Sequence, residues 1–206
     1  MKKYAFAGAG GRATTMFAVP LAKEYGDVAQ IVGVFDPNRK RCEALAKRTE
    51  TEIPLYTDFD TMLEETKPDV VIVATVDRYH HEYIVRALHA GCDVISEKPL
   101  TIDDEKCRAI LKAQEQNGKK VAVTFNVRFM PFVTRIKELI HEGCVGDILS
   151  VHFEWMLDTE HGADYFRRWH RKKENSGGLL VHKATHHFDM VNWLIDDEPV
   201  KVNAFG

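Results

Sequence analysis

The chain has 206 residues, of which 45% are hydrophobic and 29% are charged, and its formal net charge is −3. This composition is typical of a globular protein with an ordinary core, and the small net charge gives no general attraction to nucleic acid or to anionic membranes. No apolar run is long enough to span a bilayer, and glycines break the first apolar stretch, which argues against a signal peptide. The four cysteines form no CxxC pair, so we expect reduced thiols and a cytoplasmic protein.

The first 125 residues alternate between short apolar runs and amphipathic stretches. The predicted strands are 4–7, 31–35, 53–56, 70–75, 94–96 and 120–125. The predicted helices are 13–25, 39–48, 59–65, 79–89 and one that is capped by Thr101 or Asp103 and runs to 117. Strands that alternate with helices in this way predict an α/β fold, a doubly wound parallel Rossmann sheet over residues 1–123.

The pattern changes after Phe125. It predicts a helix over 132–142, a strand over 148–156, a segment without clear period over 157–176, a His-rich helix that ends near Ile195, and a strand over 199–205. Together these elements predict a second, α+β domain over residues 124–206. Because the chain stops at Gly206 just after its last strand begins, we expect this domain to be incomplete.

The turn after the first strand fits the pattern G-x-G-x-x-A. Gly8 permits the tight turn, Gly10 lets the backbone approach a pyrophosphate, and Ala13 lets the next helix pack closely on the sheet. Gly11 and Arg12 open that helix, whose first N–H groups favour a phosphate. The turn follows a strand and opens a helix at the start of a βαβ unit, which is the context that makes the pattern a dinucleotide site rather than a simple glycine turn.

Asp36 ends the second predicted strand. A carboxylate at this point can accept hydrogen bonds from the ribose hydroxyls of NAD and repels the 2′-phosphate of NADP. Arg39, Lys40 and Arg41 follow closely and could neutralise a 2′-phosphate if their loop turned inward. The sequence therefore favours NAD, with NADP as the alternative.

Further motifs resemble the Gfo/Idh/MocA family of oxidoreductases (glucose–fructose oxidoreductase, inositol dehydrogenase and relatives) over nearly the whole chain. Besides the glycine turn, they are Ala74-Thr75 with His80, Glu97-Lys98-Pro99, Asn126-Val127-Arg128-Phe129-x-Pro131, and Gly177-Gly178 followed by His186-x-x-Asp189. The resemblance implies hydride transfer between NAD and a hydroxyl-bearing carbon of a sugar or polyol, and a homo-oligomer where the second domain is complete. It also implies cofactor contacts from Thr75, His80, Glu97, Lys98, Asn126 and Arg128.

Lys98 follows the fifth predicted strand, at the edge of the sheet where open α/β folds place their ligands. Pro99 restricts the backbone there and so directs the lysine. Beside a nicotinamide, a lysine can hydrogen-bond a substrate hydroxyl and favour its alkoxide, and a dry site can lower its pKa. Placement alone would also suit a surface lysine; the resemblance favours a catalytic one.

The second cluster of candidate catalytic residues is His182, Lys183 and His186, which we expect on one helix with the two histidines on the same face. In the resemblance, His186 takes the place of the acid/base histidine. His182 stands where the family usually has Asp, and Lys183 stands where an apolar residue is usual, so either is a candidate to hold a neighbouring hydroxyl. His187 is expected at the helix surface or a domain interface.

His182 and His186 also have the spacing of two zinc ligands on one helical turn. A zincin needs a glutamate directly after the first histidine, and here Lys183 brings a positive charge instead. We therefore expect no metal. The basic run from Arg167 to Lys173 is interpreted as a solvated loop at Lys172 and Lys173; a substrate or anion contact stays open for Arg167, Arg168 and Trp169.

Two further functions remain open at this point. Some relatives use NAD only transiently, oxidising a sugar, eliminating a glycoside and returning the hydride; release of NADH would separate the two chemistries. A sensor that binds NAD or a sugar without catalysis is the other alternative, and it has no need of both Lys98 and His186.

Overall fold

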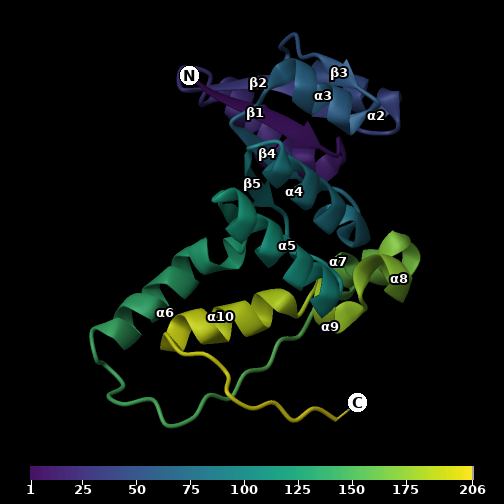
Figure 1. The fold of residues 1–206 in the computed structure, drawn as a ribbon. Coiled ribbons are helices and arrows are strands. Elements are labelled where there is room, and N and C mark those ends of the chain that lie inside the picture. The colour runs from purple at the N-terminus through teal and green to yellow at the C-terminus, as the bar shows by residue number, and fades with distance from the viewer. Residues whose placement is uncertain (206) are drawn as a thin grey trace.

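The computed structural model describes residues 1–205 of the chain. Six parallel strands form one sheet in the order β3–β2–β1–β4–β5–β6 (Figure 1). The strands are β1 Lys2–Ala7, β2 Ala29–Phe35, β3 Leu55–Tyr56, β4 Val70–Val73, β5 Asp93–Ser96 and β6 Val121–Val123. The strand order reverses beside β1, which is the switch point where open α/β sheets bind their ligands. The predicted doubly wound Rossmann sheet is confirmed.

Helices cover both faces of this sheet (Figure 1). One face packs against α3 Phe59–Thr66, α4 His80–His89 and α5 Asp104–Asn117; the other packs against the π-helix η1 Ala13–Ala18 with its continuation α1 Val19–Lys23, and against α2 Arg39–Thr49. The alternation of β4 explains how one strand serves both layers, because Val71 and Val73 join the first core and Ile72 joins the second. None of the helices over residues 1–205 is long and apolar enough to cross a bilayer.

Side-chain caps fix where several of these helices begin. Asn38 accepts a hydrogen bond from a first-turn N–H of α2 at 3.1 Å, and Asp58 accepts one from α3 at 2.8 Å. Of the two predicted caps for α5, the structure uses Asp103, which accepts from a backbone N–H at 2.9 Å. Each cap satisfies a donor that has no partner within the helix.

The second half of the chain is mostly helical where it packs against itself or the first half. Its elements are the 3₁₀ turns η3 Asn126–Phe129 and η4 Trp169–Arg171, and the helices α6 Pro131–His141, α7 Thr159–Arg167, α8 Lys173–Ser176, α9 Leu179–His182 and α10 Thr185–Ile195. The helices α6 and α10 lie side by side (Figure 1) and bury Val133 and Met190 between them. An ion pair between Arg128 and Asp189 joins η3 to α10, with Nε 2.7 Å from a carboxylate oxygen.

Two predicted strands in this half are wrong. Residues 148–156 and 199–205 form no strand among the described residues, because no neighbouring strand there pairs with them. Many of their apolar side chains face solvent, Leu149 at 95% exposure and Phe205 at 100%. The segment 157–176, which shows no clear period in the sequence, contains α7, η4 and α8.

Candidate active site

The glycine turn follows β1 and is pressed against the end of β4. Gly8 has φ +97°, and a Cβ there would lie 2.6 Å from the carbonyl oxygen of Ala74, so only glycine fits. A Cβ built on Gly10 or Gly11 would meet nothing within 4 Å, which leaves a cradle beside the helix start at Ala13. The first N–H groups of a helix have no partner inside it, so this cradle fits a pyrophosphate.

Asp36 holds the same turn from the end of β2. Its side chain is 5% exposed, and its oxygens accept from the N–H groups of Ala9 at 3.1 Å and Asn38 at 2.8 Å. A carboxylate offers about four acceptor positions, so capacity remains for a ribose hydroxyl. Of the nearby basic residues, Arg41 lies 3.8 Å from Asp36 and Arg39 pairs with a glutamate on its own helix.

Beyond the turn lies a cavity of about 620 Å³, at the carboxyl ends of β4 and β5. Side chains from both halves of the chain line it, including α7, η4, α9 and α10 of the second half. The predicted site residues that line it are Arg12, Thr75, His80, Glu97, Lys98, Asn126, His182, Lys183 and His186. The others (Gly8, Gly10, Gly11, Ala13 and Asp36) build the turn or flank it, and Arg128 lies outside the cavity in its ion pair with Asp189.

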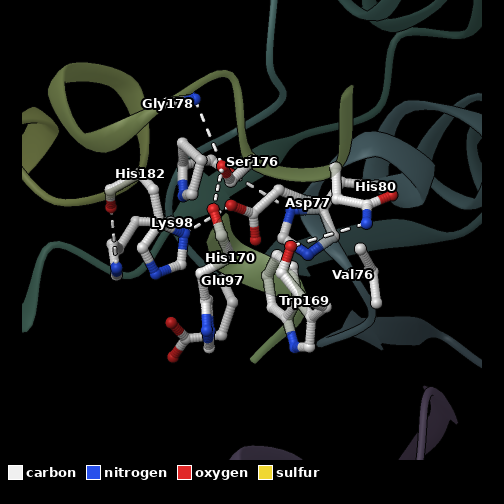
Figure 2. A network of polar contacts seen from close by, with 12 residues as sticks. Val76, Asp77, His80, Glu97, Lys98, Trp169, His170, Ser176, Gly178 and His182 are labelled. Carbon is white, nitrogen blue, oxygen red and sulfur yellow. Dashed lines mark hydrogen bonds and ion pairs between the residues drawn. The ribbon is translucent and has the colours of Figure 1, made fainter. Parts of the chain in front are cut away.

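Lys98 lies two residues beyond the end of β5 and points into this cavity (Figure 2). Its Nζ donates to the carbonyl oxygen of His182 at 3.0 Å, which ties the end of the sheet to the end of α9. The preceding residue, Glu97, is buried and accepts from Arg12 Nε at 3.0 Å. Burial lowers the pKa of Lys98, while the carboxylates of Asp77 and Glu97 oppose that effect.

The predicted single helix through His182 and His186 is broken in the structure. The helix α9 ends at His182 and α10 begins at Thr185, with Lys183 at φ −102° between them. The short α9 follows Gly177 and Gly178, both at positive φ, so the chain enters it from a sharp turn rather than from a longer helix. Although they belong to different helices, both histidines line the same cavity.

Asp77 is a buried partner of His182 that the sequence analysis missed (Figure 2). Its Oδ2 lies 2.5 Å from His182 Nδ1, and its residue is 3% exposed. Burial raises the pKa of Asp77 to about 7. Burial, together with the charges of Lys98 and Lys183, lowers the pKa of His182 to about 3. Burial therefore favours the uncharged form of both partners, a protonated Asp77 beside a neutral His182.

His186 is buried at the start of α10, with its ring edge toward Phe125 at a centroid separation of 6.1 Å. Burial and the nearby charges of Lys98 and Lys183 lower its pKa to about 3, so the ring is neutral at physiological pH. Its Nδ1 is buried without a hydrogen-bond partner among the described residues. A buried polar atom without a partner is exceptional, and it marks this ring for a role beyond packing.

An aromatic wall closes the cavity from the segment 157–176. Tyr165, Trp169 and His170 each contact the ring of His182, with centroid separations of 5.4, 5.6 and 4.7 Å. Of the basic-run residues left open in the sequence, Arg168 and Trp169 line the cavity. An aspartate shortly after an all-apolar strand is all that the sequence shows of Asp77, and neither its burial nor its contact with His182 can be read from that pattern. The aromatic wall has no periodic signal either.

The remaining predictions concern His80, His187 and a metal. His80 is 1% exposed, and its ring nitrogens face the carbonyl oxygens of Pro99 at 2.9 Å and Thr75 at 3.3 Å, so it braces the two loops beside the cavity. His187 is half-buried and stacks on Trp155 at 4.8 Å between centroids. Among the residues whose side chains are described, no three His, Cys, Asp or Glu form a group that could hold a metal ion.

Comparison with known proteins decides the family. Residues 2–125 match the oxidoreductase family GFO_IDH_MocA with an NAD-binding Rossmann fold, and residues 137–206 match the C-terminal alpha/beta domain of the same family. The chain belongs to the Gfo/Idh/MocA oxidoreductase family. The resemblance found in the sequence is therefore confirmed, as are the Rossmann fold and NAD as the cofactor of this domain.

Individual relatives agree with this assignment. YteT of Bacillus subtilis (strain 168), which is named as an oxidoreductase, is 41% identical over 100% of this chain and 49% of its own length. Inositol 2-dehydrogenase of Rhizobium meliloti (strain 1021) is 30% identical over 85% of this chain and 50% of its own length. The crystal structure of the WlbA dehydrogenase from Chromobacterium violaceum, in complex with NADH and UDP-GlcNAcA, has a TM-score of 0.80 and 25% identity over 94% of this chain and 55% of its own. The chain spans about half the length of these proteins.

Proposed function

We propose that this chain carries the reaction centre of an NAD-dependent dehydrogenase that oxidises a hydroxyl-bearing carbon of a sugar or polyol. The observation that carries the proposal is one cavity lined by Lys98 from the sheet edge and His186 from α10. It opens beside a turn whose glycines fit a dinucleotide. The bound nicotinamide supplies the hydride chemistry, and the protein supplies position and proton handling.

The N-terminal half holds the cofactor in this proposal. The turn from Gly8 to Ala13 presents backbone N–H groups to the pyrophosphate, and Asp36 accepts hydrogen bonds from the adenosine ribose. Arg12 borders both the turn and the cavity, where its pair with Glu97 fixes it. These residues would hold the cofactor beside the cavity without needing Lys98 or His186.

Lys98 and His186 handle the substrate proton. The ammonium of Lys98 donates hydrogen bonds, and its lowered pKa brings it nearer to exchanging a proton with a sugar hydroxyl. His186 is neutral in the free protein, so it accepts a hydrogen bond from the hydroxyl. As the hydroxyl loses its proton, negative charge builds up on the substrate oxygen. That charge raises the pKa of His186, which burial had lowered, so the ring accepts the proton only as the hydroxyl gives it up.

His182 holds a neighbouring hydroxyl, and Asp77 decides which way it does so. When Asp77 is ionised, it accepts the proton of His182 Nδ1 and leaves Nε2 as an acceptor for the ligand. When Asp77 is protonated, its hydroxyl donates to Nδ1 and the histidine proton moves to Nε2, which becomes a donor. The family's usual carboxylate at position 182 is here replaced by a ring whose tautomer a buried carboxylate controls.

Substitution of Lys98 and His186 tests the proposal. Lys98→Ala and His186→Ala should each leave the Kd for NAD nearly unchanged, because neither residue holds the pyrophosphate or the ribose. Each should lower the rate of NADH formation roughly 100-fold or more, the scale for losing a positioned acid or base. Lys112→Ala, on the exposed face of α5, is the matched control. The double variant should lose less than the product of the two single losses.

Three results would contradict this assignment. Near-normal turnover in either single variant removes that residue from the mechanism. A collapse of NAD affinity in Lys98→Ala makes the lysine a cofactor ligand instead. Consumption of a glycoside with no net release of NADH replaces the dehydrogenase with a redox-neutral cleavage that only borrows the cofactor.

A further inference from the structure

Four cationic side chains line the cavity, and three of them already have an oxygen partner. The three pairs are Arg12 with Glu97 (3.0 Å), Arg168 with Asp164 (3.1 Å), and Lys98 with the carbonyl oxygen of His182 (3.0 Å). Within the described part of the chain, no carboxylate lies at ion-pair distance from the fourth cation, Lys183. Lys183 is therefore the one of these four cations for which the described part of the chain supplies no oxygen partner.

Lys183 is not an ordinary surface lysine. It lies in the break between α9 and α10 and is only partly exposed. Burial and the charge of Arg12 lower its pKa. The ring of Trp155 is the nearest aromatic face, with its centroid 6.0 Å from Nζ, at the outer limit of a cation–π contact. A half-buried ammonium without a counter-charge costs free energy, which a bound anion would offset.

The charge of Lys183 also reaches the groups that are proposed to move the proton. It lowers the pKa of Lys98, His182 and His186. Lys183 lines the same cavity as Lys98 and His186 and directly follows His182 in the chain, so one ligand in this cavity can meet all of them.

We propose that the substrate of this cavity is a sugar acid whose carboxylate binds Lys183, an inference that rests on the dehydrogenase function proposed above. The free hydrogen-bond donors favour a carboxylate over a phosphate, because Lys183 is the single lining cation without an oxygen partner among the described residues, and one ammonium suits one carboxylate. A phosphate dianion would require a second free cation, and the other three are engaged. The two lining carboxylates of α7, Glu160 and Asp164, are exposed, and neither forms an ion pair with Lys183 in the described part of the chain.

Matched pairs of sugars test this proposal. The substrates are D-galacturonate against D-galactose and D-glucuronate against D-glucose, which differ by a carboxylate in place of a hydroxymethyl group. The readouts are kcat/KM for NADH formation and the Kd of each sugar for the protein saturated with NADH, by calorimetry. The variant is Lys183→Met, which keeps the length and apolar stem of the side chain. Lys112→Met is the control on an exposed helix face.

In the unsubstituted protein, at least one acid should bind more tightly and react faster than its neutral match. Lys183→Met should lower that acid-to-neutral ratio about 10- to 100-fold, the range for a hydrogen bond to a charged group of about 1.5–3 kcal/mol. Lys183→Arg should restore part of the ratio, and Lys112→Met should keep it unchanged.

Each other outcome separates the two proposals. Binding of an acid that depends on Lys183 but gives no NADH supports the carboxylate site and overturns the dehydrogenase function. Neutral sugars that bind as tightly as their acids overturn the carboxylate site and leave the dehydrogenase standing if NADH forms. Lys183→Met could also lower kcat/KM and sugar affinity equally for the acid and its neutral match, or lower them because NAD binds more weakly. Either result assigns the lysine to the cofactor and also overturns the proposal.

Discussion

The two halves of the chain differ in how their apolar residues are buried. In residues 1–125 every strand of the sheet pairs with a neighbour, and helices cover both faces, so that side chains such as Phe6 and Ile72 are almost fully buried. In the second half, the segments outside the helices leave Leu149 and Met156 more than nine-tenths exposed. The apolar core of the first half is therefore complete within that half. The second half buries its side chains chiefly where it lines the cavity or where α6 packs on α10.

Core substitutions give the largest expected difference between the halves. Ile72→Ala removes a buried side chain from the centre of the sheet and should lower the free energy of unfolding by about 2–5 kcal/mol. Leu149→Ala removes an equally large side chain from solvent and should change it by less than about 0.5 kcal/mol. Urea unfolding followed by circular dichroism measures both. A loss for Leu149→Ala as large as that for Ile72→Ala would mean that the second half has a core of its own around this residue.

Removing the carboxylate of Asp77, which contacts His182 in the second half, should have the next largest effect, on kcat/KM. The pKa of Asp77 is raised to about 7, so the carboxylate loses its proton as the pH rises through neutrality. That change makes His182 Nε2 an acceptor, and kcat/KM for substrate oxidation should therefore rise with pH around 7. The low pKa values of His182 and His186 exclude them as the source of this rise.

Asp77→Asn should abolish the rise and lower kcat/KM about tenfold or more at pH 8, because an amide cannot titrate and its NH2 group, by donating to Nδ1, holds His182 in the tautomer with the proton on Nε2. The pH profile of initial rates is the measurement. Asp104→Asn, on an exposed turn of α5, is the control and should keep the profile. A profile that stays the same in Asp77→Asn would show that the rise comes from another group, such as Lys98.

A smaller effect is expected at Asp36, which does not line the cavity. A carboxylate at position 36 would repel a 2′-phosphate, so the protein should bind NAD more tightly than NADP. Asp36→Ala should lower the ratio of the Kd for NADP to the Kd for NAD several-fold, so that the two values differ by no more than about tenfold. Calorimetric titration with both cofactors tests this. Equal affinities in the unsubstituted protein would assign control of the site to Arg39 or Arg41.

The sequence predicts the fold of the first half of the chain better than that of the second half. Each strand of the sheet is next to its helix in the chain, so periodicity, glycine turns and caps such as Asp103 determine it locally. The predicted strands 148–156 and 199–205 have the right alternation, but a strand exists only when another strand pairs with it, and the local pattern cannot supply that partner. The break after His182 also escaped prediction, because the spacing of the two histidines suits an unbroken helix equally well.

The sequence predicts the site residues that belong to a motif, and it misses those that only a tertiary contact brings to the site. Lys98 and His186 stand in short motifs, and both line the cavity as the sequence predicts. Asp77 became visible only through its contact with His182, which lies far away in the chain. Tyr165 and Trp169 came from a segment without periodic pattern, so only the fold could bring them together.

The break between α9 and α10 has a consequence for how such a protein can diverge. It places His182 at the last residue of α9 and Lys183 in the short joint that follows. If these two residues contact the substrate as proposed, exchanges there would alter what the cavity accepts without touching the glycine turn after β1. Substitutions in a single dipeptide would then be enough to change the preferred sugar, while the sheet and the glycine turn keep their sequence.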